Sequence, residues 1–290
     1  MRDFTSELLE LIRLTSTDLP KQVEERLKAA LANEEPGSAA QAALETILKN
    51  VAMTRKNSTP ICQDTGTPIF YIQAPTSVDK EELTSQIRNA VKLATEKSYL
   101  RPNAVDPVTG KNTGNNLGDK HFPSIHFQTS ENDVFTIDLI LKGGGCENVG
   151  AQYSLPDYEL NADRDLEGVR KVALDAVFCA QGEGCAPGFL GIAIGGDRGT
   201  SYAASKEVFL RDPDDTNQNA ELEQLENLIT AQANQLGIGP MGFGGKSTLL
   251  DTKIASTYRL PASFFVTISY MCWAFRHHKM IVQSNDVTYD

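Results

Sequence analysis

Apolar residues recur at helical spacing through the first part of the chain. One such stripe consists of Phe4, Leu8, Leu11 and Ile12, and similar stripes return in residues 20–31 and 40–51. Positions i, i+3, i+4 and i+7 of an α-helix share one face, which can be buried. Pro36-Gly37-Ser38 separates the second stripe from the third, because proline and glycine favour turns. We therefore predict a helical N-terminal segment over residues 1–57.

Helical and strand patterns both follow this segment. Helical spacing covers residues 83–94, 166–180 and 222–229, whereas residues 69–72, 134–142, 189–194 and 264–271 are short apolar or alternating runs typical of strands. The two kinds of element mix without strict β–α–β alternation, so we predict an α+β fold with a mainly antiparallel sheet. No linker composition interrupts the chain, and we expect a single domain, residues 1–290, on which the helical segment packs.

One long segment fits neither pattern. Residues 101–123 are rich in Asn, Gly, Pro and Asp, too polar and too often broken for a core element. They predict a loop, and a loop of this length inside a compact domain is usually functional.

The charge and the N-terminus narrow the class of protein. The net charge of −11, from 27 basic and 38 acidic residues, argues against nucleic acid as a partner, since phosphate groups require a basic surface. The chain starts without the apolar region of a signal peptide, and no apolar run approaches the length of a membrane span. We therefore expect a cytoplasmic protein with no membrane contact. A small anionic substrate remains compatible, because a few convergent arginines act at short range.

Two motifs that suggest nucleotide binding fail on their context. Gly237 to Gly242 matches G-x-G-x-x-G, but it follows a predicted helix instead of a strand, and Pro240 lacks an N–H group. Gly245-Lys246-Ser247 is similar to the end of a P-loop, yet Pro240 stands where the first glycine belongs. We reject both hypotheses. The histidines show no zinc-ligand spacing, and we interpret all four as loop or surface residues: His121, His126, His277 and His278.

Five cysteines without an export signal favour burial, metal binding or thiol chemistry over disulfides. They are Cys62, Cys146, Cys179, Cys185 and Cys272. Cys62 lies in a Pro/Asp/Gly loop, Cys185 in a Gly-rich loop and Cys272 at the end of a strand. Spacing alone leaves a shared metal site open, because only the fold could bring residues so distant together. Cys179 falls on the apolar face of a predicted helix and is expected to be buried, and Cys146 could line a pocket.

Six short motifs stand in a fixed order along most of the chain. They are Ile61-Cys62-Gln63-Asp64-Thr65-Gly66-Thr67, Asn112-Thr113-Gly114-Asn115-Asn116, Lys142-Gly143-Gly144-Gly145, Gly184-Cys185-Ala186-Pro187 leading to Ile194-Gly195-Gly196, Leu236-Gly237-Ile238-Gly239-Pro240 and Cys272-Trp273-Ala274-Phe275-Arg276. In this order they resemble the cluster-binding α region of the class I fumarate hydratases and the related L-tartrate dehydratases.

The resemblance implies a cofactor and its ligands. A [4Fe–4S] cluster, enclosed by the fold, would be held by Cys62, Cys185 and Cys272. Four cysteines are the usual complement, so three leave one iron open. The open iron could bind a hydroxy acid and act as a Lewis acid on the departing hydroxide. An electron carrier, in contrast, would normally close all four positions.

The resemblance also implies roles in substrate binding and proton transfer. Asp64 would be the catalytic acid, Gln63 and Arg101 would bind the substrate, and Gly145 would offer its backbone at close range. Ordinary alternatives are an Asx-turn residue for Asp64, a surface ion pair for Arg101 and a strand terminator for Gly145.

The resemblance finally implies an activity and a partner. A β subunit would complete the active site, in an (αβ)2 assembly that reversibly hydrates fumarate to malate. L-tartrate dehydratase and mesaconate (methylfumarate) hydratase are alternatives within the class, and a non-catalytic cluster or interaction subunit is the alternative outside it. Leu260 stands where the family commonly has histidine, and Ala186 where it commonly has proline, which keeps the identity of the dicarboxylate open.

Overall fold

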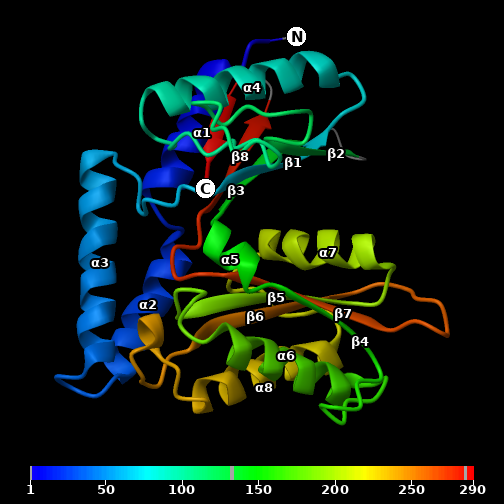
Figure 1. Cartoon of the computed structure of the whole chain (residues 1–290). Helices are drawn as coiled ribbons and strands as arrows, with labels where there is room; N and C mark the ends of the chain where they lie inside the picture. The colour runs from blue at the N-terminus through cyan, green and yellow to red at the C-terminus, as the bar shows by residue number, and fades with distance from the viewer. Residues whose placement is uncertain (1, 131–133, 284–285) are drawn as a thin grey trace. The chain divides into compact units, whose positions relative to one another are not determined.

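The chain folds into two compact units that both contain helices and strands. The computed structural model describes residues 2–130, 134–283 and 286–290. Unit 1 consists of Met1–Pro20, Lys49–Gly144 and Arg276–Asp290, and unit 2 of Lys21–Leu48 and Gly145–Phe275. The α+β class is confirmed (Figure 1). The single domain expected for residues 1–290 stays a prediction.

Unit 1 is built on a five-stranded sheet with the order β2-β1-β3-β8-β9. The strands are β1 (Thr67–Ala74), β2 (Ser124–Thr129), β3 (Phe135–Lys142), β8 (His277–Gln283) and β9 (Asp286–Tyr289). Helices α1 (Thr5–Thr17) and α4 (Lys80–Glu96) pack against each other, and their apolar stripes form one core with the sheet. Leu8, Ile87 and Leu139 are fully buried in this core. The helical spacing of the sequence thus corresponds to the face that each helix buries.

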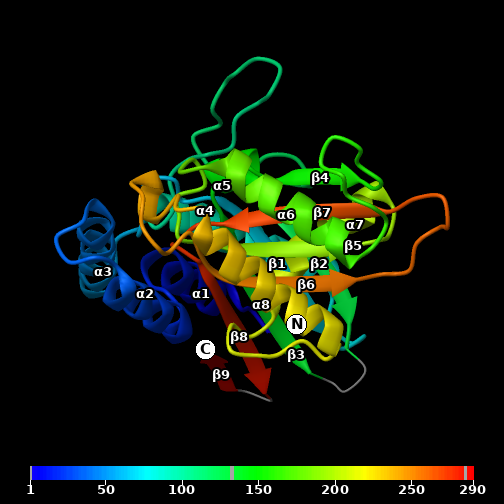
Figure 2. The same ribbon diagram turned by 90° about the horizontal axis from the view of Figure 1, so that it is seen from below.

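Unit 2 is a four-stranded sheet between helices. The order is β4-β7-β5-β6, with β4 (Ala151–Ser154), β5 (Gly188–Ile194), β6 (Leu249–Ser256) and β7 (Phe265–Met271). Helices α6 (Leu166–Ala180) and α8 (Ala220–Gln235) cover one face, and α7 (Arg198–Glu207) covers the other (Figures 1 and 2). Five of the seven described strand pairings, in the two sheets together, are antiparallel, which confirms the predicted sheet type.

The N-terminal segment is helical as predicted, and the two units share it. Helix α1 belongs to unit 1, α2 (Lys21–Asn33) belongs to unit 2, and α3 (Ala39–Asn57) passes from unit 2 into unit 1. The short helix α5 (Gly144–Asn148) follows β3. Residues 101–123 contain no helix or strand, as expected, and residues 105–114 are all exposed in the long loop visible in Figure 2.

Two expectations about individual side chains were wrong. Cys179 is exposed although Val177 and Ala180 of the same last turn of α6 are buried, so the buried face of the helix does not include Cys179. His277 and His278 are not surface residues but buried positions of β8. His277 Nε2 lies 2.9 Å from Asp138 Oδ1, so a carboxylate on the neighbouring strand β3 compensates its burial.

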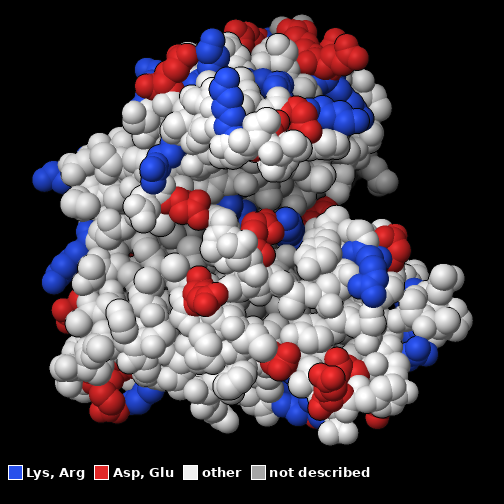
Figure 3. Space-filling view, viewed as in Figure 1, with Lys and Arg blue, Asp and Glu red and all other residues white. Residues whose placement is uncertain are grey.

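Charged side chains of both signs lie side by side on the exposed face of α4. Figure 3 shows basic and acidic side chains interspersed over this part of the surface. The helix begins with Asp79 as its N-cap, which accepts hydrogen bonds from the backbone N–H groups of Glu81 and Glu82.

Among the described residues, no helix is both long enough and apolar enough to cross a membrane.

Candidate functional site

The Asp64 carboxylate of unit 1 is held by two backbone N–H groups. Gly66 N donates to Oδ1 at 3.0 Å, and Gly144 N donates to Oδ2 at 2.7 Å. The second contact follows from strand register, because β1 and β3 pair Thr67 with Lys142 and bring the residues beyond β3 to the loop before β1. Gly66 must be glycine here: its φ is +78°, and a Cβ would lie 2.8 Å from the backbone of Leu141.

Two arginines contact consecutive carbonyl groups of the same loop. Arg101 Nη1 donates to Gln63 O at 3.2 Å, and Arg276 Nη1 donates to Asp64 O at 2.5 Å. Arg101 is exposed, and among the described residues it makes no ion pair. The loop from Cys62 to Asp64 is therefore fixed by its main chain.

Cys185 and Cys272 lie next to each other in unit 2. Strands β5 and β7 pair Phe189 with Met271, so the loop before β5 meets the residues after β7. Trp273 N donates to Cys185 O at 3.3 Å, which joins the two cysteine segments directly. Cys185 has a φ of +54°, a conformation that side-chain-bearing residues rarely adopt and that the surrounding contacts must maintain.

Tyr270 fills a slot between the two glycines that flank Cys185. Its ring would lie 2.6 Å from a Cβ on Gly184 and 2.4 Å from a Cβ on Gly188. Burial raises the pKa of the Tyr270 phenol, and the charges of the nearby Cys272, Cys146 and Cys185 raise it further. The phenol is therefore protonated at neutral pH.

The predicted site residues are divided between the units. Cys62, Gln63, Asp64 and Arg101 belong to unit 1, whereas Gly145, Cys185 and Cys272 belong to unit 2. A Cβ built on Gly145 would lie 3.5 Å from Glu183 O, an ordinary van der Waals contact, and Gly145 is exposed. Across the described part of the chain, no three His, Cys, Asp or Glu side chains form a group that could hold a metal ion. The cluster and its ligands therefore stay predictions.

The Gly-rich loop that is similar to a P-loop binds a carboxylate group of the same chain. The carboxylate of Glu34, which is 5% exposed, accepts hydrogen bonds from Lys246 N at 3.0 Å and Ser247 N at 2.9 Å. These are the backbone donors that a phosphate group would need. The same loop supports Cys185, because Met241 N donates to Ala186 O at 2.8 Å.

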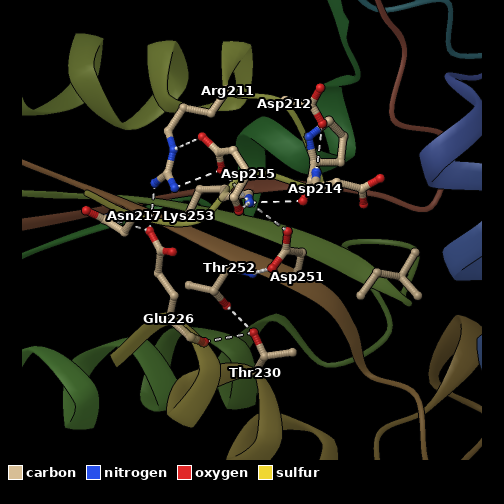
Figure 4. Close-up of polar contacts among 12 residues, drawn as sticks. Arg211, Asp212, Asp214, Asp215, Asn217, Glu226, Thr230, Asp251, Thr252 and Lys253 are labelled. Carbon is tan, nitrogen blue, oxygen red and sulfur yellow. Dashed lines mark hydrogen bonds and ion pairs between the residues drawn. The ribbon is translucent and has the colours of Figure 1, made fainter. Parts of the chain in front are cut away.

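A network of ion pairs in unit 2 shows how this protein pairs charges in a structural role. Figure 4 shows Arg211 between Asp215 and Glu226, with Lys253 also on Asp215. Arg211 Nε and Nη2 each donate to Asp215 at 2.9 Å, and Nη1 donates to Glu226 at 2.7 Å. Burial alone would raise the pKa of Asp215, but hydrogen bonds from Arg211 and Lys253 lower it below its usual value. Each cation in this network has a counter-ion.

Sequence reasoning missed Arg276 and Tyr270, although both lie within or beside a quoted motif. Arg276 is 2% exposed and Tyr270 is 2% exposed, and both contact a candidate site residue or its immediate neighbours. The only available signal was their position, since Arg276 closes the last motif and Tyr270 stands two residues before Cys272.

Comparison with known proteins identifies relatives along almost the whole chain. The model of a family described as fumarate hydratase (Fumerase) matches residues 5–281. A Geobacillus stearothermophilus protein named for fumarate hydratase class I is 47% identical over 289 residues, which are 98% of this chain and 56% of the relative. The L(+)-tartrate dehydratase subunit alpha of Escherichia coli K12 is 30% identical over 279 residues, which are 96% of this chain and 89% of that subunit. The chain thus spans about half of the first relative and most of the second.

Proposed function

Because this chain belongs to the fumarate hydratase (Fumerase) family, we propose that it is the cluster-binding subunit of a hydro-lyase that reversibly hydrates fumarate to malate. The observation that carries the proposal is the Asp64 loop, where a carboxylate fixed by two N–H groups adjoins an exposed arginine. A hydration site needs both features, an acid for the hydroxide and a cation for the substrate carboxylates.

We propose that Cys62, Cys185 and Cys272 ligate a [4Fe–4S] cluster with one open iron. The adjacency of Cys185 and Cys272 in unit 2 supports this, and soft thiolates suit iron–sulfur centres. When bound, such a cluster supplies a Lewis acid for the hydroxyl group of the substrate.

The chain's own residues then bind the substrate and move the proton. Arg101 binds one substrate carboxylate, for which a planar guanidinium is well shaped. Asp64 gives its proton to the departing hydroxide or accepts one from the arriving water. Gln63 donates a hydrogen bond to the substrate, and Gly145, which is exposed and has no side chain, admits it close to the backbone.

A β subunit completes the active site in this proposal, in an (αβ)2 assembly in the cytoplasm. One observation supports a separate partner chain: the Escherichia coli relative is itself named as a subunit alpha.

L-tartrate dehydratase is the second candidate function. The L(+)-tartrate dehydratase subunit alpha of Escherichia coli is 30% identical to this chain over 279 residues, which supports this candidate. Mesaconate hydratase is the third candidate, because one methyl group on the substrate changes only the lining of the pocket.

Anaerobic reconstitution tests the proposal. The chain is combined with a candidate β subunit, loaded with iron and sulfide, and assayed on fumarate, L-tartrate and mesaconate. We expect turnover of fumarate; turnover of L-tartrate alone would replace the first candidate by the second. A fully formed cluster with no activity on any of the three substrates would contradict a hydro-lyase.

Matched cysteine variants test the ligands. Cys62→Ser, Cys185→Ser and Cys272→Ser should each prevent stable cluster binding, because serine offers a hard hydroxyl in place of a thiolate. Cys179→Ser is the control, since Cys179 is exposed on α6. Iron content and the visible absorption of the cluster are measured; full occupancy in any of the three ligand variants would remove that cysteine from the set.

A further inference from the structure

Arg276 is a buried cation with almost no partners. Its side chain is among the largest fully buried ones, with 2% exposure. Nη1 donates to Asp64 O at 2.5 Å, whereas Nε has no hydrogen-bond partner, and no carboxylate of the described residues pairs with the guanidinium. A guanidinium has five N–H donors, and a buried charge without a counter-ion is costly. Stability alone does not account for an arginine at this position.

The ion-pair network of unit 2 provides the comparison. Arg211 is less buried, with a side-chain exposure of 22%, yet it contacts two carboxylates (Figure 4). The same protein therefore neutralises an arginine fully where its role is to connect structural elements. Arg276, more deeply buried, contacts one carbonyl group, and that carbonyl belongs to the proposed proton-transfer residue. Buried polar groups without a full set of hydrogen-bond partners are found mainly at functional sites.

The main chain and the side chain of Arg276 both contact the segments that hold Asp64. Its main-chain carbonyl accepts a hydrogen bond from Leu141 N, near the end of β3, at 3.0 Å. A Cβ on Gly143 would lie 2.9 Å from Asp64 Oδ2 and 3.4 Å from Arg276 Nη2, so the carboxylate and the guanidinium line the same glycine. The guanidinium thus fixes the main chain of Asp64, and the N–H groups of Gly66 and Gly144 fix its carboxylate.

We propose that Arg276 is a positioning residue that holds Asp64 in one orientation for proton transfer. This inference rests on the proposed function, in which Asp64 is the catalytic acid. Proton transfer depends on the placement of the carboxyl group, and a displacement of about 1 Å can cost on the order of 100-fold in rate. Arg276 acts through Asp64 and need not contact the substrate.

Kinetics of the loaded enzyme with its β subunit test the inference first. Arg276→Ala should lower kcat by roughly 100-fold and leave KM within about threefold, since substrate binding is retained while the acid is misplaced. Arg101→Ala should instead raise KM, because it removes a carboxylate contact. Arg276→Lys keeps the charge but cannot reproduce the fork and should recover only part of the rate. Free guanidinium ion, far below denaturing concentrations, should partly restore kcat in Arg276→Ala.

Amide hydrogen exchange provides a readout that needs no activity. The Gly66 and Gly144 N–H groups are protected by the Asp64 carboxylate, so Arg276→Ala should raise their exchange rate by about tenfold. Arg211→Ala, the matched structural variant, should leave both amides unchanged. If Arg276→Ala does not fold, Arg276→Gln, which keeps most of the volume, is measured in its place.

The outcomes separate this inference from the proposed function. Unchanged protection of both amides together with an unchanged kcat overturns the positioning role. Faster exchange at Gly66 and Gly144 in a chain that hydrates none of the tested dicarboxylates supports the positioning role and removes the proposed function. A rise in KM with kcat unchanged also overturns the inference, because it assigns Arg276 to substrate binding.

Discussion

Replacement of Glu34 by alanine tests how the Gly-rich loop of unit 2 is stabilised. The Glu34 carboxylate accepts hydrogen bonds from Lys246 N at 3.0 Å and from Ser247 N at 2.9 Å. Both donors belong to a loop with several glycines at positive φ. Such a loop has a large conformational entropy when unfolded, so it depends on the anion to order it. Gly245 must stay small beside it, because a Cβ would lie 2.7 Å from Glu34 Oε2.

The expected loss follows from the two donors. A hydrogen bond to a charged group contributes about 1.5–3 kcal/mol, and a buried donor left without a partner costs a similar amount. Ser247 N is buried, whereas Lys246 N lies in an exposed residue and can turn to water. We therefore expect Glu34→Ala to lower the free energy of unfolding by about 3 kcal/mol. Glu34→Gln, which keeps an acceptor oxygen but loses the charge, should cost about 1 kcal/mol.

The assay is urea unfolding followed by the fluorescence of Trp273. It is the only tryptophan of the chain and lies in unit 2, so it reports on the unit that holds Glu34. Glu35→Ala is the matched control, because the adjacent carboxylate pairs with the side chain of Lys246 at the surface and should leave the midpoint unchanged. Equal midpoints for Glu34→Ala and Glu35→Ala would refute the reasoning.

Three further predictions concern the two cores. Gly188→Ala should destabilise unit 2 by about 1–3 kcal/mol, because the new methyl group overlaps the Tyr270 ring. In a Tyr270→Ala background this loss of stability should vanish, and a loss of equal size there would contradict the overlap. Leu8→Ala, at a fully buried position of unit 1, should cost about 2–5 kcal/mol in calorimetry or urea unfolding. Burial and the neighbouring His277 lower the pKa of His278 to about 4, whereas in the unfolded chain this side chain binds a proton below its ordinary pKa of about 6.5. The free energy of unfolding should therefore fall by up to about 3 kcal/mol as the pH drops from 6.5 to 4. A His278→Leu variant should lose this pH dependence.

Elements with a continuous apolar stripe could be predicted from the sequence, and those with buried charge could not. Helix α4 is recognisable from the stripe of Leu83, Ile87, Ala90, Val91 and Ala94. Strand β6 was missed, because Asp251, Thr252 and Lys253 interrupt its alternation, although Lys253 is buried by its ion pair with Asp215. A hydrophobic pattern treats every charged residue as exposed, so it fails where the fold supplies the counter-ion.

The site was predicted as a set of loops and not as a set of contacts. The resemblance to the family placed Asp64 and Arg101 in one region, and the structure brings their segments together through Gln63 O. The contact between Arg276 and Asp64 joins residues 212 positions apart, and no local pattern encodes such a pairing. Cys179 shows the converse limit, since helical periodicity defines an apolar face but not which residues at its margin the rest of the fold covers.

The discontinuous composition of unit 1 has a consequence for synthesis on the ribosome. Strand β8 lies between β3 and β9 in its sheet, and residues 276–290 provide both β8 and β9. A growing polypeptide can assemble unit 2 as soon as residue 275 has left the exit tunnel, whereas β3 must wait for its partner with an open edge. The Asp64 loop acquires the Arg276 side chain only after residue 276 has emerged, so this contact forms later than the earliest point at which unit 2 can assemble.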